Sequence, residues 1–460
     1  MNFKIPAVCV ALGALFIVQP VHRIAAQTPA HPRVTFNGQI AAIVYKNCSA
    51  CHRPGEAAPF SLLSYQDVAK RGKLIAAVTT ARIMPPWRAE PASYAYRDER
   101  RLSDSDIALL RDWVEQGMPE GAGKAPDAPK FNSGWRLGEP DLVVEMPAAY
   151  HLKADGPDIY RNIALPLGLT GEKWITAIEM RTTARAAVHH VLYFADPNGR
   201  VHLKPNDGDE PGFGGMRAGG ATMPLGGWAV GAQPQFFPEG LALRVPQGSD
   251  LVLQYHFHPT GKPETEKSLI GLHFAKEAPS RNMLAIQLPP VYSLFAGLDI
   301  PAGEKDFVIR DSYTLPVEID AAGVSAHAHY LASRMKLTAT LPDGEVKTLL
   351  SIGDWNFNWQ DQYFFQDMVA LPRGTRLDAE IHWDNSAENP HNPASPPIRV
   401  TWGEQSKDEM GALTLIAVPR RQMDYRMLQR DVSQKRAMMA QQKIFSDPQL
   451  IKKIAELLAQ

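Results

Sequence analysis

Hydrophobic and polar residues alternate in short runs over most of the chain. Between residues 140 and 418 these runs have a period of two and are separated by turn residues, as in DLVVEMP, KWITAIEMRT, DLVLQYHFH, RMKLTATL and RLDAEIHW. Such alternation over roughly four to eight residues is typical of strands with one buried face. The pattern predicts all-β tandem antiparallel sandwiches of the jelly-roll type, which we divide at residues 140–285 and 286–418.

Helical periodicity appears only near the two ends of the chain. In LSDSD, Ser103 is placed to cap a helix with Asp106 three residues later, and an apolar stripe follows at Ile107, Leu110 and Val114. From residue 419 to 460, basic residues interleave with Met, Leu and Ile at helical spacing, with Ser446 or Asp447 as a second cap. We expect a small all-α domain at the first site and a helical tail at the second. The tail would pack on the protein or bind a partner, and binding to a membrane surface is the less favoured alternative.

Composition and charge narrow the functional classes. The chain has 460 residues, which corresponds to roughly three domains. Its 48 Lys and Arg balance 49 Asp and Glu, giving a formal net charge of -1. Nucleic acid is therefore excluded as an expected partner, because phosphate binding needs a concentrated basic surface.

The first residues predict export. Lys4 precedes an apolar run over residues 7–18, and Ala25 and Ala26 offer a cleavage site before Gln27. This is the layout of a secretory signal peptide at residues 1–26, and the run is too short to span a bilayer. An uncleaved anchor is the alternative. We expect a periplasmic protein without membrane association.

The cysteines indicate a haem. Cys9 belongs to the predicted signal peptide, so the mature chain keeps only Cys48 and Cys51, followed by His52 in CSACH. This arrangement suits covalent haem, in which both thiols attach to the macrocycle and the imidazole binds iron. A zinc site, which would need further ligands nearby, and a thioredoxin-like redox pair are the alternatives.

A second iron ligand is expected in the sequence MPP, where Met84 precedes two prolines. Met118 is the competitor, but it directly follows the predicted helix and is expected to pack beside its end. With CSACH, the Met-Pro element and a closing W-x-x-x-G-x-P segment in order, residues 30–122 resemble a small mono-haem class I cytochrome c. The resemblance implies one covalent haem c. A linker rich in Gly, Pro and Ala follows at residues 123–139.

Histidines form three close pairs in the predicted β region: His189 and His190, His256 and His258, and His327 and His329. Strand residues two apart share a face, so each of the last two pairs can converge on one ion. The adjacent first pair can do so only at a bulge, a bend or a strand end. We interpret the isolated histidines as ordinary structural residues: His151, His202, His273, His382 and His391.

A thioether donor points to copper. Imidazole suits several metals, whereas Met410, just before an apolar strand, would favour Cu(I). Residues 140–418 resemble the copper- and ascorbate-dependent monooxygenases, the family of peptidylglycine and dopamine hydroxylases. The matched elements occur in the family's order: H-H at 189–190, L-Q-x-H at 253–256, H-x-H at 327–329 and S-x-D-E-M at 406–410.

The resemblance implies two coppers and an oxidoreductase activity. An electron-storing copper would be bound by His189, His190 and His256. A catalytic, oxygen-binding copper would be bound by His327, His329 and Met410. The implied reaction uses O2 to hydroxylate a C–H bond of a small organic substrate. His258 lies outside the matched pattern.

Two departures from the family shape the expectation. Ser325 and Thr414 stand where the peptide-amidating members use Arg and Tyr to hold a carboxylate, which argues against such a substrate. The tethered haem is expected to replace ascorbate and pass electrons from an upstream donor to the His189 copper. Two other classes stay open: a copper and haem electron-transfer protein without monooxygenase activity, and a non-enzymatic binding module.

Overall fold

The computed structural model describes Met1 and residues 33–54, 56, 58–131, 134–215, 223–229 and 232–446. The predicted signal peptide, Met1 apart, and the tail beyond Ser446 lie outside the described residues. No helix within these ranges is both long enough and apolar enough to cross a membrane.

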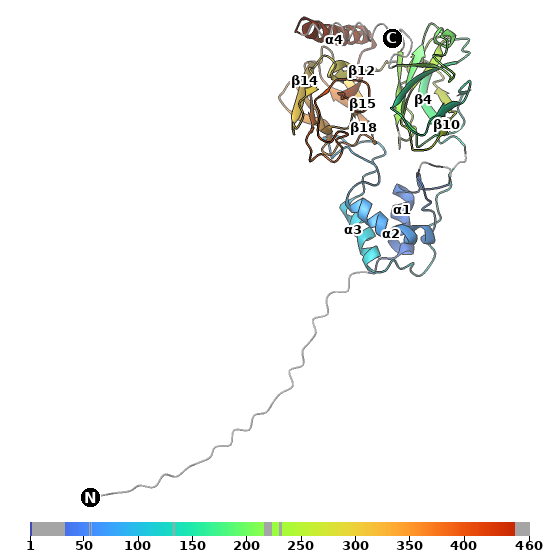
Figure 1. Ribbon diagram of the computed structural model, residues 1–460, viewed down its shortest axis with the longest axis vertical. Coiled ribbons are helices and arrows are strands. Elements are labelled where there is room, and N and C mark those ends of the chain that lie inside the picture. Colours follow the sequence, from blue (N-terminus) through green and yellow to red (C-terminus); the bar gives the residue numbers. More distant parts are fainter. Residues whose placement is uncertain are drawn as a thin grey trace.

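The first helices gather at one end of the molecule, below the sheets in Figure 1. They are the π-helical η1 Phe36–Ile40, α1 Ala41–Asn47, α2 Tyr65–Thr80 and α3 Asp104–Glu115. Ser103 caps α3, since its hydroxyl accepts a hydrogen bond from the Asp106 amide at 3.1 Å. Leu110 is buried, and Ile107 and Val114 pack against the same apolar cluster. The predicted cap and the predicted stripe are both confirmed.

The next part of the chain folds into two antiparallel sheets around a shared core. One sheet has the order β6-β3-β9-β5-β7 and the other β1-β11-β4-β8. Their strands are β1 Leu142–Glu145, β3 Ile159–Pro166, β4 Lys173–Arg181, β5 Val188–Asp196, β6 Phe213–Gly214, β7 Met223–Ala229, β8 Leu243–Val245, β9 Asp250–Phe257 and β11 Leu269–Phe274. A separate ribbon joins β2 Tyr150–Leu152 and β10 Glu264–Glu266. We call this unit the first sandwich.

A second sandwich follows, again with two antiparallel sheets and a core of its own. The sheet orders are β12-β21-β15-β18 and β14-β19-β16-β17. Their strands are β12 Leu284–Leu288, β14 Phe307–Thr314, β15 Ile319–Ala328, β16 Ala332–Thr340, β17 Val346–Ile352, β18 Gln362–Leu371, β19 Arg376–Trp383 and β21 Gly411–Pro419, and a small pair joins β13 Asp299–Ile300 and β20 Val400–Thr401. Each of the five alternating segments quoted above contains a strand, so the predicted antiparallel β-sandwiches are confirmed.

The described part of the tail is a helix, α4 Tyr425–Ser446, which lies on the second sandwich at the end away from α1–α3 (Figure 1). Leu428 is buried in the core of that sandwich. Polar contacts hold the helix further along: the Tyr313 hydroxyl donates to Asp431 at 2.7 Å, and Lys435 bonds Asp311 at 2.6 Å. The prediction of a packed helix is confirmed as far as Ser446.

Residues 86–101, predicted to belong to the cytochrome domain, leave the helical cluster and pack on the second sandwich. We call this segment the docking arm. Tyr96 pairs with Phe365 in an isolated antiparallel bridge, and its hydroxyl donates to the Leu349 carbonyl at 2.7 Å. Ala89 and Tyr96 are buried in the core of the second sandwich. The arm therefore adds a short extended edge beside β18, which the sequence did not predict.

Candidate metal centre between the sandwiches

Two neighbouring strands of the first sandwich bring three histidines together. His189 and His190 come from β5 and His256 from β9. One ligand atom from each lies within 4.8 Å of the others. The ring centroid of His256 is 5.0 Å from that of His189 and 4.8 Å from that of His190. This first cluster can hold a metal ion.

A β-bulge makes the adjacent pair usable. Val188 lies opposite Phe257, whereas His190 lies opposite His256, so the pairing slips by one residue at His189. An extra residue in one strand breaks the alternation of side chains between the two faces. As a result the two imidazoles point to the same place, with their Nδ1 atoms 3.0 Å apart. The sequence predicted that the adjacent pair could converge only at a bulge, a bend or a strand end, and the structure has a bulge at His189.

The nitrogen atoms of His256 fit metal binding. Its Nε2 lies 3.1 Å from a carboxylate oxygen of Asp158. Because an ionised carboxylate only accepts, Nε2 carries the hydrogen and Nδ1 presents a lone pair. Nδ1 is buried and lacks a hydrogen-bond partner in the described part of the chain. Leaving such an atom unpaired costs about 1–3 kcal/mol, and a metal ion would supply the missing partner.

Asp158 also connects the two sandwiches. Its carboxylate accepts hydrogen bonds from His258 Nδ1, at 2.8 Å, and from the hydroxyl of Ser406 in the second sandwich. Burial would raise the pKa of Asp158, but the hydrogen bonds from His256, Ser406 and His258 outweigh burial and hold the pKa below its usual range. His258 shares a face with His256, as predicted. It is 57% exposed and lies outside the three-histidine group.

The second predicted pair converges as well. His327 lies near the end of β15 and His329 directly follows it, and their ring centroids are 5.6 Å apart. Nδ1 of His327 is 2.6 Å from the side-chain oxygen of Gln360. Nδ1 of His329 is 3.1 Å from the Asp408 carbonyl. Both Nδ1 atoms therefore donate, and each ring presents the lone pair of its Nε2.

Met410 lies beside His329. Ala328 pairs with Gly411 across β15 and β21, so His329 and Met410 are the next residues along the two strands. Their backbone amides both donate to one carboxylate oxygen of Glu409, at 3.2 and 3.1 Å. Met410 is only 1% exposed. The backbone pairing thus puts Met410 next to His329, and a thioether beside two imidazoles is a donor set that favours Cu(I).

The two clusters face each other across the junction of the sandwiches. The ring centroids of His190 and His327 are 6.1 Å apart. The Phe357 ring stacks on His189 at 4.1 Å and lies 5.8 Å from His329. Donor residues from two separate folding units therefore gather at one buried place.

A loop that the sequence analysis missed contacts both clusters. It comprises residues 353–361, between β17 and β18, and we call it the junction loop. It supplies Phe357 and Gln360, and its Trp355 indole donates to the His329 carbonyl at 3.0 Å. Its run GDWNFNWQD contains no residue of the usual metal-ligating pattern besides Asp. The feature that could have indicated this loop is its high content of aromatic and amide side chains.

The predicted haem ligands occupy the turn after α1. The amides of Cys51 and His52 both donate to the Cys48 carbonyl, at 3.2 and 3.0 Å, and both thiols are free. Burial, with a smaller effect from Cys51, raises the pKa of Cys48 to about 12. His52 Nδ1 is 3.2 Å from the Phe60 carbonyl, which leaves Nε2 available for iron. These residues fit an attached haem.

The two candidate methionines have different surroundings. Met84 lines a cavity of about 540 Å³ between α2, α3 and the junction-loop residue Asp354. The residues that line this cavity do not include Cys48, Cys51 or His52. The Met118 sulfur lies over Gly72, where an added Cβ would approach it to 2.4 Å. Met118, which follows the end of α3, therefore packs its side chain against α2, a contact that the sequence analysis did not specify.

Four of the five isolated histidines have ordinary surroundings. Three of them contact carboxylates: His151 contacts Glu210, His202 contacts Asp250, and His382 contacts Asp306 and Glu380. His273 is buried in β11 with Phe236 against its ring, and its buried Nε2 lacks a hydrogen-bond partner among the described residues. His391 is exposed in a loop. None of the five belongs to the three-histidine group.

Comparisons with known proteins give no family. No family model and no curated protein matches the chain. Among solved structures, PBCV-1 VP54, fitted into a reconstruction of the virophage Sputnik, is 7% identical, with 63% of this chain and 95% of that chain covered and a TM-score of 0.23. PNGF-II is 10% identical over 60% of this chain and 65% of its own, with a TM-score of 0.24. The Sulfolobus Turreted Icosahedral Virus structure is 11% identical over 66% of this chain and 98% of its own, with a TM-score of 0.25. Similarities this low carry no argument about fold or function.

Proposed function

We propose that this chain is an exported, haem c-linked dicopper monooxygenase that uses O2 to hydroxylate a C–H bond of a small organic substrate. The observation that carries the proposal is the gathering of five histidines at the junction of two sandwiches, with Met410 next to His329 in the pairing of β15 with β21. Within it, the buried Nδ1 of His256 has no hydrogen-bond partner among the described residues. A metal ion bound by the three-histidine group would supply the partner that this atom lacks.

The protein keeps the imidazoles ready to bind. Burial lowers the pKa of His189 to about 3 and that of His327 to about 4. Burial also lowers the pKa of His190 and of His329 well below the ordinary value. Neutral rings bind a cation without first losing a proton. Copper held by these donors would supply one-electron transfer and O2 activation.

The strand pair beside His327 bears on the substrate. Ser325 and Thr414 lie opposite one another across β15 and β21, two residues before His327 on the first strand. Their hydroxyls can donate and accept hydrogen bonds but carry no charge. We therefore propose a substrate that is not anchored there by a carboxylate.

The position of the helical cluster supports electron entry from a haem. Glu56, four residues after His52, bonds Arg185 of the first sandwich at 3.1 Å. Arg185 lies just before β5, the strand that carries His189. The haem-binding turn and the first cluster are thus connected through a short stretch of chain. A haem held by Cys48, Cys51 and His52 would supply one-electron transfer from an upstream donor to the first cluster.

Metal content tests the proposal. We would express the mature chain in cells that mature c-type cytochromes and measure iron and copper per polypeptide. One iron and two coppers are expected, with one copper lost in His327→Ala and in Met410→Ala. His202→Ala is the matched control, because its ring contacts Asp250 away from both clusters and its copper content should be unchanged.

The outcomes separate the functional classes. An absence of copper after reconstitution with Cu(I) would contradict the proposal and favour a binding module. Two coppers without O2-dependent hydroxylation of any substrate in a broad C–H panel would favour an electron-transfer protein. Activity must be measured in its own right, because ligands and fold do not fix a reaction.

A further inference from the structure

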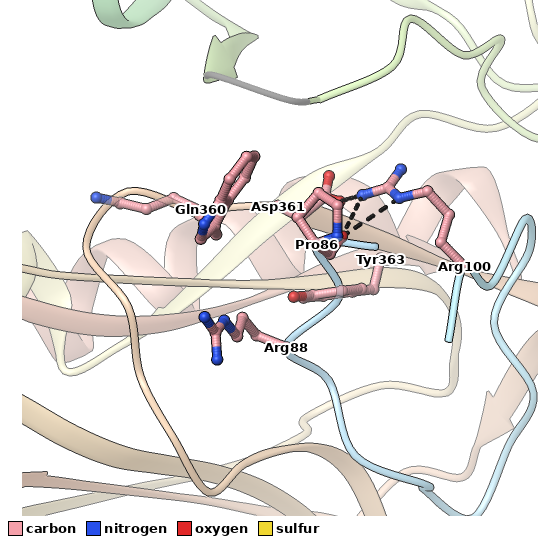
Figure 2. Close-up of a pocket in the computed structure, with 7 residues that line it drawn as sticks. Pro86, Arg88, Arg100, Gln360, Asp361 and Tyr363 are labelled. Atoms are coloured by element: carbon pink, nitrogen blue, oxygen red, sulfur yellow. Dashed lines mark hydrogen bonds and ion pairs between the residues drawn. The ribbon is translucent and has the colours of Figure 1, made fainter. Parts of the chain in front are cut away.

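The docking arm and the His327 cluster meet at the junction loop. Figure 2 shows residues around this contact: Pro86, Arg88 and Arg100 of the arm, Gln360 and Asp361 of the loop, and Tyr363 of β18, with the Gln360 side chain extending away from Arg100. These residues enclose a cavity of only about 10 Å³, room for about one water molecule. The arm is therefore packed against the loop rather than separated from it by solvent.

Gln360 holds a fixed orientation within the loop. Its side-chain oxygen lies 2.6 Å from Nδ1 of His327, and its side-chain nitrogen donates to the Phe357 carbonyl at 3.0 Å. Each end of the amide therefore has a partner of the matching kind. Because the oxygen accepts from Nδ1, the His327 ring must present Nε2 for metal binding.

Arg100 of the arm holds the neighbouring residue. Its guanidinium donates to the Asp361 carboxylate and, at 3.2 Å, to the Pro86 carbonyl. Arg100 and Asp361 are only 20% and 17% exposed, so water screens the pair weakly. The same guanidinium lies over the Trp87 ring, 5.4 Å from its centroid. The arm is thus joined to the residue next to Gln360 by a half-buried ion pair.

We propose that the docking arm is a positioning element for the His327 metal site. Arg100 fixes Asp361, and this contact keeps the Gln360 oxygen against Nδ1 of His327. Residues that hold a metal-ligating histidine by its second nitrogen typically change metal affinity by about 10–100-fold when they are removed. The inference rests on the proposed function, because it assumes that copper binds at His327. It adds that the haem-bearing region shapes this site by direct contact.

Copper affinity tests the proposal on the full-length mature protein. Cu(I) competition with a chromophoric chelator, together with Cu(II) EPR, would give the affinity and spectrum of each site, assigned with His327→Ala. Gln360→Ala should weaken the His327 site by about 10–100-fold, and Arg100→Ala should weaken it by roughly tenfold or less with the same spectral change. Because both substitutions act through one contact, their effects should not add in the double variant.

A matched control lies on the same arm. Arg97 donates to the Phe236 carbonyl and lies over Phe364, away from the Gln360 contact, so Arg97→Ala should leave both affinities unchanged. Arg100→Lys keeps the charge and should restore part of the affinity. Asp361→Asn replaces Arg100→Ala if that variant fails to fold.

Three results would overturn the inference. In the first, Arg100→Ala keeps the wild-type copper affinity and spectrum while Gln360→Ala weakens binding. This would show that Gln360 orients His327 without help from the docking arm. Additive effects in the double variant would show that the two residues act separately. A wild-type protein that binds copper at neither cluster would refute the proposed function itself, and this inference with it.

Discussion

The two histidine clusters differ in which nitrogen they offer and in what holds the rings. The first cluster is set by strand register, because the bulge at His189 turns neighbouring rings together opposite His256. Its rings meet through Nδ1 atoms, and that of His256 lacks a partner in the described structure. In the second cluster both Nδ1 atoms are occupied, by Gln360 and by the Asp408 carbonyl. Nε2 atoms remain for the ion.

This difference shows where each site can fail. The first cluster depends mainly on its own histidines and on the backbone pairing of β5 with β9. The second depends on residues outside the strands, in the junction loop and in the segment before β21. Substitutions around the second cluster should therefore disturb metal binding more widely than substitutions around the first.

The largest expected effect is the loss of a whole site in the first cluster. His256→Ala removes one of the three grouped rings, the one whose buried Nδ1 lacks a partner in the described structure, so the first copper should be lost while the second stays bound. Elemental analysis of copper per polypeptide would show a decrease from two to one. His258→Ala is the control, because that ring is largely exposed and should keep both coppers. Equal losses of copper in the two variants would show that the first site depends on the contacts that both rings make with Asp158 rather than on His256 as a metal ligand.

Local patterns predicted most of the fold. The two-residue alternation gave the strands, and the Ser103 cap gave the start of α3. The H-x-H spacing predicted the convergence of His327 and His329, because side chains two apart in a strand share a face. For His189 and His190 the sequence predicted only that they could converge if the strand were irregular there. Whether a bulge forms depends on the pairing with the partner strand, which the local sequence does not contain.

Contacts between distant segments were beyond the reach of these patterns. Gln360 is 33 residues from His327 in the chain, and nothing near either residue indicates that they meet. The docking arm was assigned to the helical domain because residues 30–122 as a whole, from CSACH to the closing W-x-x-x-G-x-P segment, resemble a cytochrome c. Its buried aromatic residue, Tyr96, packs instead against Phe365, because the edge of the second sandwich offers an apolar partner.

The next largest effect should come from Glu409, which supports the second cluster. This buried carboxylate accepts hydrogen bonds from the indole of Trp383 and from the amides of Leu331, His329 and Met410, at 2.6–3.2 Å. Glu409→Ala would leave these four donors unpaired, at about 1–3 kcal/mol for each donor that stays buried, and should lower the free energy of unfolding accordingly. Chemical denaturation would measure the loss.

Glu380→Ala is the control for that measurement. Glu380 is a partly exposed carboxylate that bonds Arg310 and His382, and its removal should cost about 1 kcal/mol or less. The Glu409 variant should also lose copper from the second cluster before the first. Equal loss of copper from the two clusters would contradict the expectation that Glu409 supports the second cluster alone.

The smallest of the three effects should come from Asp158, which supports the first cluster from outside. Asp158→Asn keeps the shape of the side chain but removes the charge that polarises His256 through Nε2. A less basic imidazole binds copper more weakly, so the affinity of the first cluster should fall by about tenfold while the second is unchanged. Chelator competition would measure both affinities. Ser406→Ala removes a neutral partner of the same carboxylate and should change them less. If Asp158→Asn weakened the second cluster instead, the Asp158–Ser406 contact between the sandwiches would be its main role, and the two clusters would form one cooperative centre rather than two separately supported sites.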